Sequence, residues 1–395
     1  MEIKIIRDDF SQMASIEQAA YSASFKGTQE ERKELEDIFK GLTENGDITA
    51  YGAYDKDLMG CVLHYDFKTN FHGKMIHTAG IGSLAVDLLH KKKRVANHLI
   101  LNSIERAKEE GVMLYYLYPF NVKFYRNFGF GYGRPMYTYC VKPEDFKDMG
   151  HRDLLSYGTS TDYNQVIEFY NDYAKSKHGM SLKTSGDIKR LYRMKQGKLI
   201  LAKDETGIIG YMIYTQKGIS QSDNQAQKII ISEMLYTKRA LSAFSSFFYA
   251  QKDQIDYIEL ATHDHRFHHI LRDTCFASEP KTMEIIALKV ADKAIGLMPL
   301  VLDPQALLDT LETKPHYELI FKINHPKAQS KDAIFGKGEK VNIELDINEF
   351  SSWITGVISL EDLYFKNLLK TDREDLLRHI DQQLYFESPI SLTRF

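Results

Sequence analysis

Residues 81–130 read IGSLAVDLLHKKKRVANHLILNSIERAKEEGVMLYYLYPFNVKFYRNFGF, and they decide the fold of the first third of the chain. An apolar strand at 76–86 runs into a basic loop, and the loop opens directly into a helix predicted over 92–110. The apolar positions of that helix recur at helical spacing, which places them on one face. A second strand follows, and then a short helical turn that carries Tyr125.

The remainder of this N-terminal unit alternates strands and helices. Turn signals at Asp55-Lys56 and at 70–73 separate runs that are rich in β-branched and aromatic residues. The other elements predicted for this unit are a strand at 2–6, helices at 11–23 and 29–41, and strands at 48–54, 57–67, 113–118 and 135–141. This pattern predicts a mixed α/β unit that ends with the strand at 135–141.

The loop at 90–94 reads His-Lys-Lys-Lys-Arg and leads into the N-terminus of the predicted helix. Unpaired backbone amides at such an N-terminus, together with the helix dipole, favour an anion. A pyrophosphate group could therefore be held by the amides of about 92–97 and by the Lys and Arg side chains. The plainer alternative is a solvated basic loop, which is what most such charge runs are.

Tyr125 is the second candidate functional group of this segment. A phenol has a reference pKa of about 10 and can donate a proton to a leaving thiolate of similar basicity. The chain has 24 tyrosines, so a half-buried structural tyrosine is the alternative interpretation.

A second unit repeats the order of the first. IGSLAV at 81–86 matches ISEMLY at 231–236, and YRNFGF at 125–130 matches LRDTCF at 271–276. A helix and a strand separate the two motifs in both units. This matching order predicts a duplicated domain.

The second copy lacks both candidate functional features of the first. Leu271 stands at the position of Tyr125, and Tyr-Thr-Lys-Arg at 236–239 replaces the longer basic loop. We therefore expect only the first copy to be active. The elements predicted for the second unit are helices at 162–177, 184–194 and 238–252, strands at 198–203, 207–215, 227–236, 255–261 and 281–288, and a helical turn at 265–272.

A third unit begins near residue 290. It has predicted helices at 303–311, 347–354, 360–368 and 372–384 and strands at 316–323 and 340–345, with a hairpin over 322–342. Three domains are therefore expected, at 1–145, 146–289 and 290–395. The helices of the third domain are expected to close the cleft of the first.

Composition excludes several classes of protein. The 51 Lys and Arg residues nearly balance the 54 Asp and Glu residues, which argues against a nucleic-acid-binding protein. No run of about 18 apolar residues exists, and the start MEIKIIRDDF lacks the features of a signal peptide. We expect a cytoplasmic protein without a membrane span. Cys61, Cys140 and Cys275 are far apart in sequence and are expected to be free thiols.

A histidine-rich segment follows the predicted strand at 255–261. His265 and His269 have the i, i+4 spacing of zinc ligands on a helix, and His263 and His268 lie beside them. The segment contains no HExxH motif and falls in the turn of the second copy. A surface or interface role is therefore expected, and no metal site.

The strand, basic loop, helix, strand and tyrosine turn resemble the GCN5-related N-acetyltransferase (GNAT) superfamily. In that superfamily a Q/R-x-x-G-x-G/A loop binds the pyrophosphate of acetyl-CoA, and Lys91-x-x-Arg94-x-Ala96 stands in its place here. Arg94 departs from the pattern, because a glycine lets the backbone approach a phosphate closely.

Over its whole length the chain resembles the enhanced-intracellular-survival (Eis-type) acetyltransferases. The HKKKR loop at 90–94, FYRNFGFGY at 124–132 and the terminal aromatic residue carry this resemblance. It implies an α/β (α+β) fold class, with tandem GNAT folds whose sheets are mixed and largely antiparallel. It also implies a C-terminal α+β domain that resembles sterol carrier protein 2.

The resemblance further implies roles for individual residues. Tyr125 corresponds to the general acid of the family, and Phe395 corresponds to the residue whose terminal carboxylate is the general base. A free α-carboxyl group has a reference pKa of about 3.5 and is ionised at neutral pH. The residues implied in binding acetyl-CoA are Leu84, Ala85, Val86, Lys91, Lys92, Lys93, Arg94, Val95, Ala96, Asn97, Phe120 and Asn121.

These roles imply an acetyl-CoA-dependent N-acetyltransferase that acts on a primary amine of a small molecule, aminoglycoside-like or polyamine, or on a lysine side chain. A homo-oligomer, a hexamer, is also implied. Arg394 and Ser24 stand where acidic residues would help to bind a polycation, which argues against aminoglycosides. The alternative is a catalytically degenerate GNAT/SCP2-like protein that binds a small molecule or lipid, and Arg94 is its best support.

Overall fold

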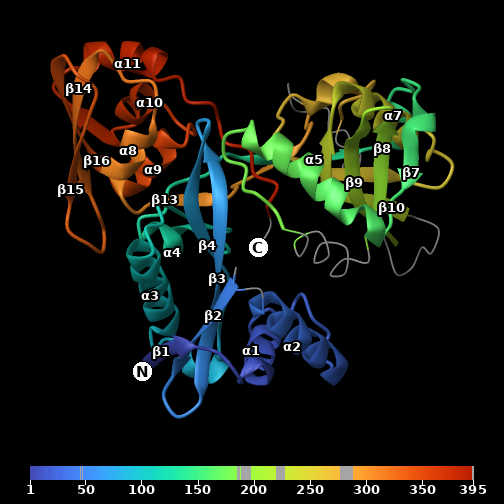
Figure 1. Ribbon diagram of the computed structural model, residues 1–395, viewed down its shortest axis with the longest axis horizontal. Coiled ribbons are helices and arrows are strands. Elements are labelled where there is room, and N and C mark those ends of the chain that lie inside the picture. Colours follow the sequence, from blue (N-terminus) through green and yellow to red (C-terminus); the bar gives the residue numbers. More distant parts are fainter. Residues whose placement is uncertain are drawn as a thin grey trace.

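The computed structural model describes residues 1–44, 46, 48–184, 187, 197–218, 227–275 and 288–393. These residues form three β-sheets with helices packed on them, and each sheet belongs to a different region of the molecule (Figure 1). Within this described part of the chain, no helix has the length and apolar character needed to cross a membrane. The predicted α/β (α+β) fold class, with mixed and largely antiparallel sheets, is confirmed.

The first sheet has six strands in the order β1-β2-β3-β4-β5-β13. Their bounds are Glu2–Ile5 (β1), Ile48–Tyr54 (β2), Leu58–Phe71 (β3), Lys74–Val86 (β4), Leu114–Leu117 (β5) and Met298–Val301 (β13). All neighbours are antiparallel except β4 and β5, which are parallel. The helices of this region are α1 (Phe10–Ala20), α2 (Gln29–Thr43), α3 (Val95–Glu109) and α4 (Val122–Arg126).

Helices cover both faces of the first sheet because successive strand residues point to opposite faces. Ala50 and Leu63 pack in one apolar cluster with α1 and α2. Their neighbours Tyr51 and Val62 pack on the other face, in the cluster that contains α3. Burial of an apolar residue on either side of the strands explains why β2 and β3 read as nearly continuous apolar runs.

The second sheet has seven strands in the order β12-β6-β11-β10-β9-β8-β7. Their bounds are Met136–Val141 (β6), Leu155–Tyr157 (β7), Lys198–Asp204 (β8), Gly207–Gly218 (β9), Gln227–Tyr236 (β10), Tyr257–Thr262 (β11) and Asp292–Ala294 (β12). Helices α5 (Tyr163–Lys175) and α7 (Lys238–Tyr249) pack on opposite faces of this sheet. As in the first sheet, one central pair, β10 and β11, is parallel.

The third sheet has four strands in the order β15-β14-β16-β17. The strands and helices of this region are β14 (Tyr317–Asn324), β15 (Lys331–Phe335), β16 (Glu339–Asp346), β17 (Leu369–Thr371), α8 (Pro304–Thr310), α9 (Ile347–Ile354), α10 (Leu360–Phe365) and α11 (Leu377–Gln383). The predicted hairpin over 322–342 contains the additional strand β15. As a result β14 and β16 are parallel neighbours rather than the two arms of a hairpin.

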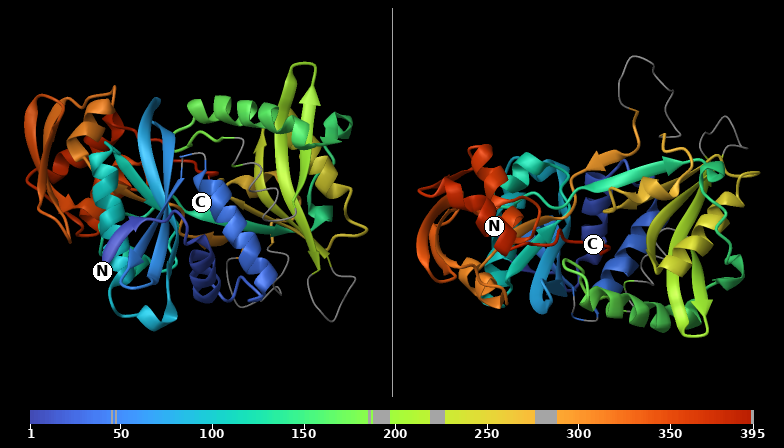
Figure 2. Two further views of the ribbon diagram at one scale, coloured as in Figure 1. Left: turned by 60° about the horizontal axis from the view of Figure 1, so that its bottom comes forward. Right: turned by 90° about the horizontal axis from the view of Figure 1, so that it is seen from above.

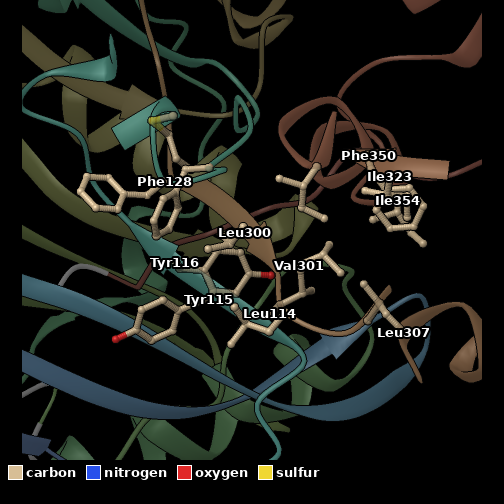
Figure 3. Packing of buried hydrophobic residues seen from close by; sticks show 14 of the residues in the cluster. Leu114, Tyr115, Tyr116, Phe128, Leu300, Val301, Leu307, Ile323, Phe350 and Ile354 are labelled. Atoms are coloured by element: carbon tan, nitrogen blue, oxygen red, sulfur yellow. The ribbon is translucent and has the colours of Figure 1, made fainter. Parts of the chain in front are cut away.

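The first and third regions share one apolar core. Figure 3 shows β5 residues such as Tyr115 packed beside Leu300 and Val301 of β13, with Phe350 of α9 on the far side. All four side chains belong to a single cluster of buried residues. The third region is thus fixed against the first sheet, as the two views of Figure 2 also show.

The first two sheets exchange a strand, which the sequence did not predict. The strand expected at 135–141 as the last of the first unit is β6, and it pairs with β11 and β12 in the second sheet. The edge of the first sheet is formed by β13, from the far side of the second unit. The prediction that 135–141 belongs to the first unit was therefore wrong.

Two glycines allow the exchanging segments to cross. A Cβ atom on Gly133 would lie 1.8 Å from the carbonyl oxygen of Leu297, and one on Gly296 would lie 2.1 Å from that of Arg134. Side chains at these positions would hold the two backbones apart, so glycine is required where the chain passes from one sheet to the other.

Most other predicted elements are confirmed to within a few residues. The helix predicted at 92–110 begins at Val95, and the helix predicted at 372–384 is a short 3₁₀ turn followed by α11. Short strands β7, β12, β13 and β17 were not predicted. The helix expected at 184–194 and the strand expected at 281–288 fall almost entirely outside the described residues.

Candidate functional site

The candidate site begins where β4 and β5 separate. These strands pair in parallel only from Thr78 with Leu114 to Ile81 with Leu117. Beyond Ile81, β4 continues to Val86 and pairs only with β3 on its other side. No strand in the described residues joins β4 along this stretch on the β5 side, so the edge that contains the predicted site residues Leu84, Ala85 and Val86 has no strand partner there.

A β-bulge changes the direction of β4 at the separation. The register between β3 and β4 shifts between Cys61 and Leu63, and β4 gains a residue relative to its partner there. Ser83 lies in the bulge with φ of +47°. The Tyr21 hydroxyl of α1 donates a hydrogen bond of 2.9 Å to the Leu84 carbonyl.

The basic loop stands at the N-terminus of α3, as predicted. Arg94 is the N-cap residue, and its side chain makes no capping hydrogen bond. The backbone amides of the first turn of α3 therefore have no partner from the helix or from a capping side chain. The predicted loop residues Lys91, Lys92, Lys93 and Arg94 are exposed, and Val95, Ala96 and Asn97 form the first turn.

The backbone at Arg94 has the conformation that a glycine would favour. Its φ is +60°, and φ of Lys92 is +68°. Left-handed conformations cost a residue with a side chain about 1 kcal/mol each, so this loop stores strain. The arginine therefore keeps the backbone path of a glycine loop while adding a positive charge.

Tyr125 lies on α4, the short helix after β5. The side chain of Asn121 accepts a hydrogen bond of 3.0 Å from the Phe124 amide and thereby caps this helix. The Tyr125 ring is 3% exposed and lies edge-on to Phe120 and Phe124. Burial raises the pKa of the Tyr125 phenol, so the group keeps its proton at neutral pH. Phe120 is 67% exposed beside it.

Two further groups at this site, Glu17 of α1 and Tyr21 at the C-terminal end of that helix, were not predicted. Glu17 and Tyr21 are one helical turn apart, and Glu17 is only 8% exposed. Burial raises the pKa of the Glu17 carboxyl to about 7, which a hydrogen bond with Ser83 partly offsets. The signal in the sequence was an acidic residue on the apolar face of the predicted helix at 11–23, beside Met13.

Phe395, the predicted general base, lies outside the described residues. The described chain ends at Thr393, whose carbonyl accepts a hydrogen bond of 2.8 Å from the Tyr118 hydroxyl of the first region. Two residues earlier, the Ser391 carbonyl lies 3.2 Å from His263 Nε2 in the second region. The C-terminal segment therefore runs between the first and second regions toward the candidate site.

The second region repeats the separation of strands. Strands β10 and β11 pair in parallel from Lys228 with Tyr257 to Ile231 with Leu260, and the register of β10 shifts before Glu233. This arrangement matches β4 and β5 and supports the predicted duplication.

The residues that surround the separation of β10 and β11 differ from those around the separation of β4 and β5. The helix α7 follows β10 at once, and Thr237 caps it by accepting a hydrogen bond from the Ala240 amide. Glu233 is buried in an ion pair with Lys183 and accepts a hydrogen bond from Tyr211. These contacts cap the N-terminus of α7 and place fixed side chains in the space beside the bulge.

The C-terminal segment borders the space that remains beside Glu233. A narrow cavity of the second region is lined by Ser232, Glu233 and, from the C-terminal segment, Leu392. Leu271, at the position of Tyr125, is buried. At the position of Tyr125 the second copy therefore has an apolar side chain, and the N-terminus of its helix α7 is capped by Thr237.

Metal-binding geometry does not occur at the predicted histidine-rich segment. His263 Nδ1 and Nε2 both lie within hydrogen-bond distance of backbone carbonyl oxygens. In the part of the chain that the structure describes, the one group of ligating atoms close enough to share a cation is that of His64, Asp66 and Glu110. That group contains neither His265 nor His269.

Two family models match the chain, and each is described as an acetyltransferase (GNAT) domain. One matches residues 4–133 and the other residues 185–290. No curated protein matches the chain.

Three solved structures share the fold over the whole chain. A conserved protein of unknown function from Enterococcus faecalis V583, a probable N-acyltransferase, is 18% identical with a TM-score of 0.77, and the match covers 100% of this chain and 99% of that one. A GCN5-related N-acetyltransferase from Anabaena variabilis ATCC 29413 is 16% identical with a TM-score of 0.79, covering 100% of both chains. Eis1 from Mycobacterium abscessus is 16% identical with a TM-score of 0.73, again covering 100% of both.

These identities are low, so the structures show a shared fold, whereas the family models identify the domains. The open first site and the filled second site belong to the two matched ranges. The chain therefore contains two GNAT acetyltransferase domains, and it is an acetyltransferase whose cosubstrate is acetyl-CoA.

Proposed function

We propose that the first GNAT domain acetylates a primary amine, carried by a small molecule such as a polyamine or an aminoglycoside-like compound, or by a lysine side chain. Tyr125 is the general acid, and the terminal carboxylate of Phe395 is the general base. The observation that carries this proposal is the contrast between two helix N-termini. The first turn of α3 has free amides beside four exposed basic residues, whereas α7 is capped by Thr237.

The groups at the first site fit the parts of acetyl-CoA. The free amides of α3 and the side chains of Lys91–Arg94 suit a pyrophosphate. The edge of Leu84–Val86 that no strand covers suits an extended arm that contains amides, because both can exchange backbone-type hydrogen bonds. The exposed ring of Phe120 offers an apolar surface next to Asn121. Acetyl-CoA supplies the acetyl group as a thioester, which is its activated form.

Tyr125 is suited to protonate the departing sulfur. Its raised pKa keeps the phenol protonated at neutral pH, which is the form that a proton donor needs. Its backbone is held by the Asn121 cap, so the ring has a fixed position relative to the bulge of β4. The equivalent Leu271 cannot donate a proton, which restricts the proposal to the first domain.

The base assignment rests on the Eis-type resemblance and on the course of the C-terminal segment. Thr393 accepts a hydrogen bond from Tyr118, which lies between β5 and Tyr125 in the sequence, and Phe395 follows Thr393 by two residues. A free terminal carboxylate is ionised at neutral pH and can accept the proton that an amine loses on acetylation.

Acetyl-CoA turnover with a panel of amines tests this function. We expect Tyr125→Phe to lower kcat by about 100-fold while acetyl-CoA still binds, since general acids contribute effects of this size. A form with two residues added after Phe395 should lose activity to a similar extent, because its carboxylate is displaced. Tyr157→Phe, at a tyrosine that is 69% exposed in the second region, is the control and should retain full activity.

Different outcomes would contradict different parts of the proposal. If the wild type binds no acetyl-CoA, the enzymatic function is wrong and a GNAT-like binding protein is favoured. If the extended form keeps its full rate, only the role of Phe395 is wrong. If Tyr125→Phe keeps its full rate, the general acid must be another group.

We further propose that the protein is cytoplasmic and that its chain divides into three domains at 1–145, 146–289 and 290–395, with β6 of the first range inserted in the sheet of the second. Copies of the chain are proposed to assemble into a homo-oligomer, a hexamer. The third domain, with its four-stranded sheet and helices, is proposed to resemble sterol carrier protein 2. Light scattering of the purified protein measures the assembly, and a monomer at micromolar concentration would contradict it.

A further inference from the structure

A buried carboxyl group on the α1 side of the site has no role in the chemistry proposed above. Glu17 lies on the last turns of α1 and is 8% exposed. Its Oε2 atom has no hydrogen-bond partner. No basic side chain among the described residues forms an ion pair with it, so any negative charge on Glu17 is unpaired.

Contacts with β4 direct this carboxyl group toward the bulge. Ser83, the bulge residue with φ of +47°, is its hydrogen-bond partner. One helical turn after Glu17, the Tyr21 hydroxyl donates to the Leu84 carbonyl at 2.9 Å. The two α1 side chains therefore reach consecutive residues of β4, at the point where β4 leaves β5.

Tyr21 links Glu17 to the proposed general acid. Tyr21 lies close enough to Tyr125 to contribute to its raised pKa, and Glu17 in turn contributes to the raised pKa of Tyr21. Glu17 and Tyr21 therefore both reach the bulge of β4 from the α1 side, and Tyr21 contributes to the raised pKa of Tyr125. A cation that entered the separation of β4 and β5 from the α1 side would meet the Glu17 carboxyl group beside Ser83.

An unpaired buried carboxylate is costly unless a cation joins it. The acceptor brings such a cation, because alkylamines have pKa values near 10 and are protonated at neutral pH. An ammonium group has no lone pair and cannot attack a thioester. One proton must therefore leave the nitrogen before the bond to the acetyl group can form.

We propose that Glu17 receives the incoming ammonium group and removes this first proton, a role that rests on the acetyltransferase function proposed above. The N–H bond breaks, its electron pair stays on nitrogen, and an O–H bond forms at Glu17 Oε2. The neutral amine then attacks the acetyl carbon and loses its second proton to the terminal carboxylate of Phe395, while Tyr125 protonates the sulfur. Each transferred proton therefore has a donor and an acceptor.

The titration of Glu17 suits this role. Burial raises the pKa of its carboxyl group to about 7, so the group is ionised in half of the molecules near neutral pH and holds an accepted proton well. It can give up that proton after turnover, since its pKa lies close to the pH of the medium.

Two acceptors of different basicity test the proposal with the full-length protein. The first is an alkylamine, and the second is an arylamine that is neutral at pH 7. For the alkylamine we expect Glu17→Gln to lower kcat/KM by about 100-fold at pH 7. For the arylamine the same variant should act like the wild type, because no first proton has to be removed. Glu34→Gln, at an exposed position of α2, is the control for loss of a carboxylate.

The wild type gives a second readout that does not depend on a variant. Its kcat/KM for the alkylamine should rise through a pKa near 7, and this step should be absent for the arylamine and absent in Glu17→Gln. Loss of activity on both amines alike, or an unchanged rate on both, would overturn the role of Glu17 while leaving the enzyme an acetyltransferase. If the wild type acetylates neither amine, the proposed function and this inference both fail.

Discussion

Acid should loosen the junction of the three regions through a pair of stacked histidines. His72, in the turn between β3 and β4, lies with its ring centroid 3.8 Å from that of His178, which follows α5. The His72 amide donates to His178 Nδ1 at 3.1 Å, and His178 Nε2 faces the Thr355 carbonyl at 3.3 Å. His72 Nε2 faces the Ile354 carbonyl at 3.0 Å. Because Nδ1 of His178 is an acceptor, the folded protein requires this ring to be neutral.

Burial, and next the neighbouring His72, lower the pKa of His178 from 6.5 to about 3. The pKa of His72 is lowered in the same direction by burial. The unfolded chain therefore binds more protons than the folded one below pH 6.5, so stability is complete above that pH and is lost as the pH falls toward 3. For His178 alone, the loss between pH 7.5 and pH 5 amounts to about 2 kcal/mol.

Urea unfolding at pH 7.5 and pH 5 measures this loss. The single tryptophan, Trp353, packs against Phe386, which also contacts His72, so its fluorescence reports on the junction. His178→Gln keeps an acceptor and a donor but cannot titrate, and its loss of stability should be smaller by about 2 kcal/mol. His316→Gln, at an exposed histidine, is the matched control and should lose as much as the wild type. Equal losses for wild type and His178→Gln would refute the reasoning.

Three further substitutions test other parts of the structure. Arg94→Gly should raise stability by about 1 kcal/mol in thermal unfolding, because it relieves a left-handed backbone, yet weaken acetyl-CoA binding several-fold in a salt-sensitive way; equal affinity at low salt would contradict a role for the charge. Gly133→Ala should cost about 2 kcal/mol or more, because its Cβ atom meets the Leu297 carbonyl; a neutral effect on the melting temperature would contradict the tight crossing. Lys183→Met should cost about 3 kcal/mol or more by leaving Glu233 buried without its partner, and the double variant with Glu233→Leu should recover much of this in urea unfolding.

Local patterns predicted the elements that build the candidate site. The apolar periodicity of α3 and the turn signals around β3 and β4 act within a few residues, so their positions follow from the sequence. The basic loop at the N-terminus of α3 was likewise evident, because four consecutive basic residues precede the first apolar position. The left-handed backbone of Arg94 was not, since it depends on how the loop joins two fixed elements.

The strand exchange could not be predicted, because the side chains of β6 and β13 would alternate between the two faces in the same way in either sheet. The close approach of the backbones at Gly133 and Gly296 determines which sheet each strand joins. This approach is not evident from the sequence, because a glycine in a loop is compatible with many backbone paths. Glu17 was missed for a similar reason. A single acidic residue on an apolar helix face gains meaning only once β4 and Ser83 are packed against it.

The two separated strand pairs show how one backbone arrangement can be kept open or filled. In both domains the parallel pairing stops at an isoleucine, Ile81 or Ile231, and the strand then bulges. In the first domain the bulge residue is Ser83, too small to fill the space, whereas the matching Glu233 is fixed by Lys183 and Tyr211.

The filled domain still contributes to the candidate site, because its residues hold the C-terminal segment. His263 contacts the Ser391 carbonyl, and Leu392 lines the space beside Glu233, before Thr393 reaches Tyr118 of the first domain. The fixed side chains of the second domain thus form a surface against which the C-terminal segment packs. Disruption of the second domain would then reduce activity by releasing the C-terminal segment, even though this domain has Leu271 in place of the proposed general acid.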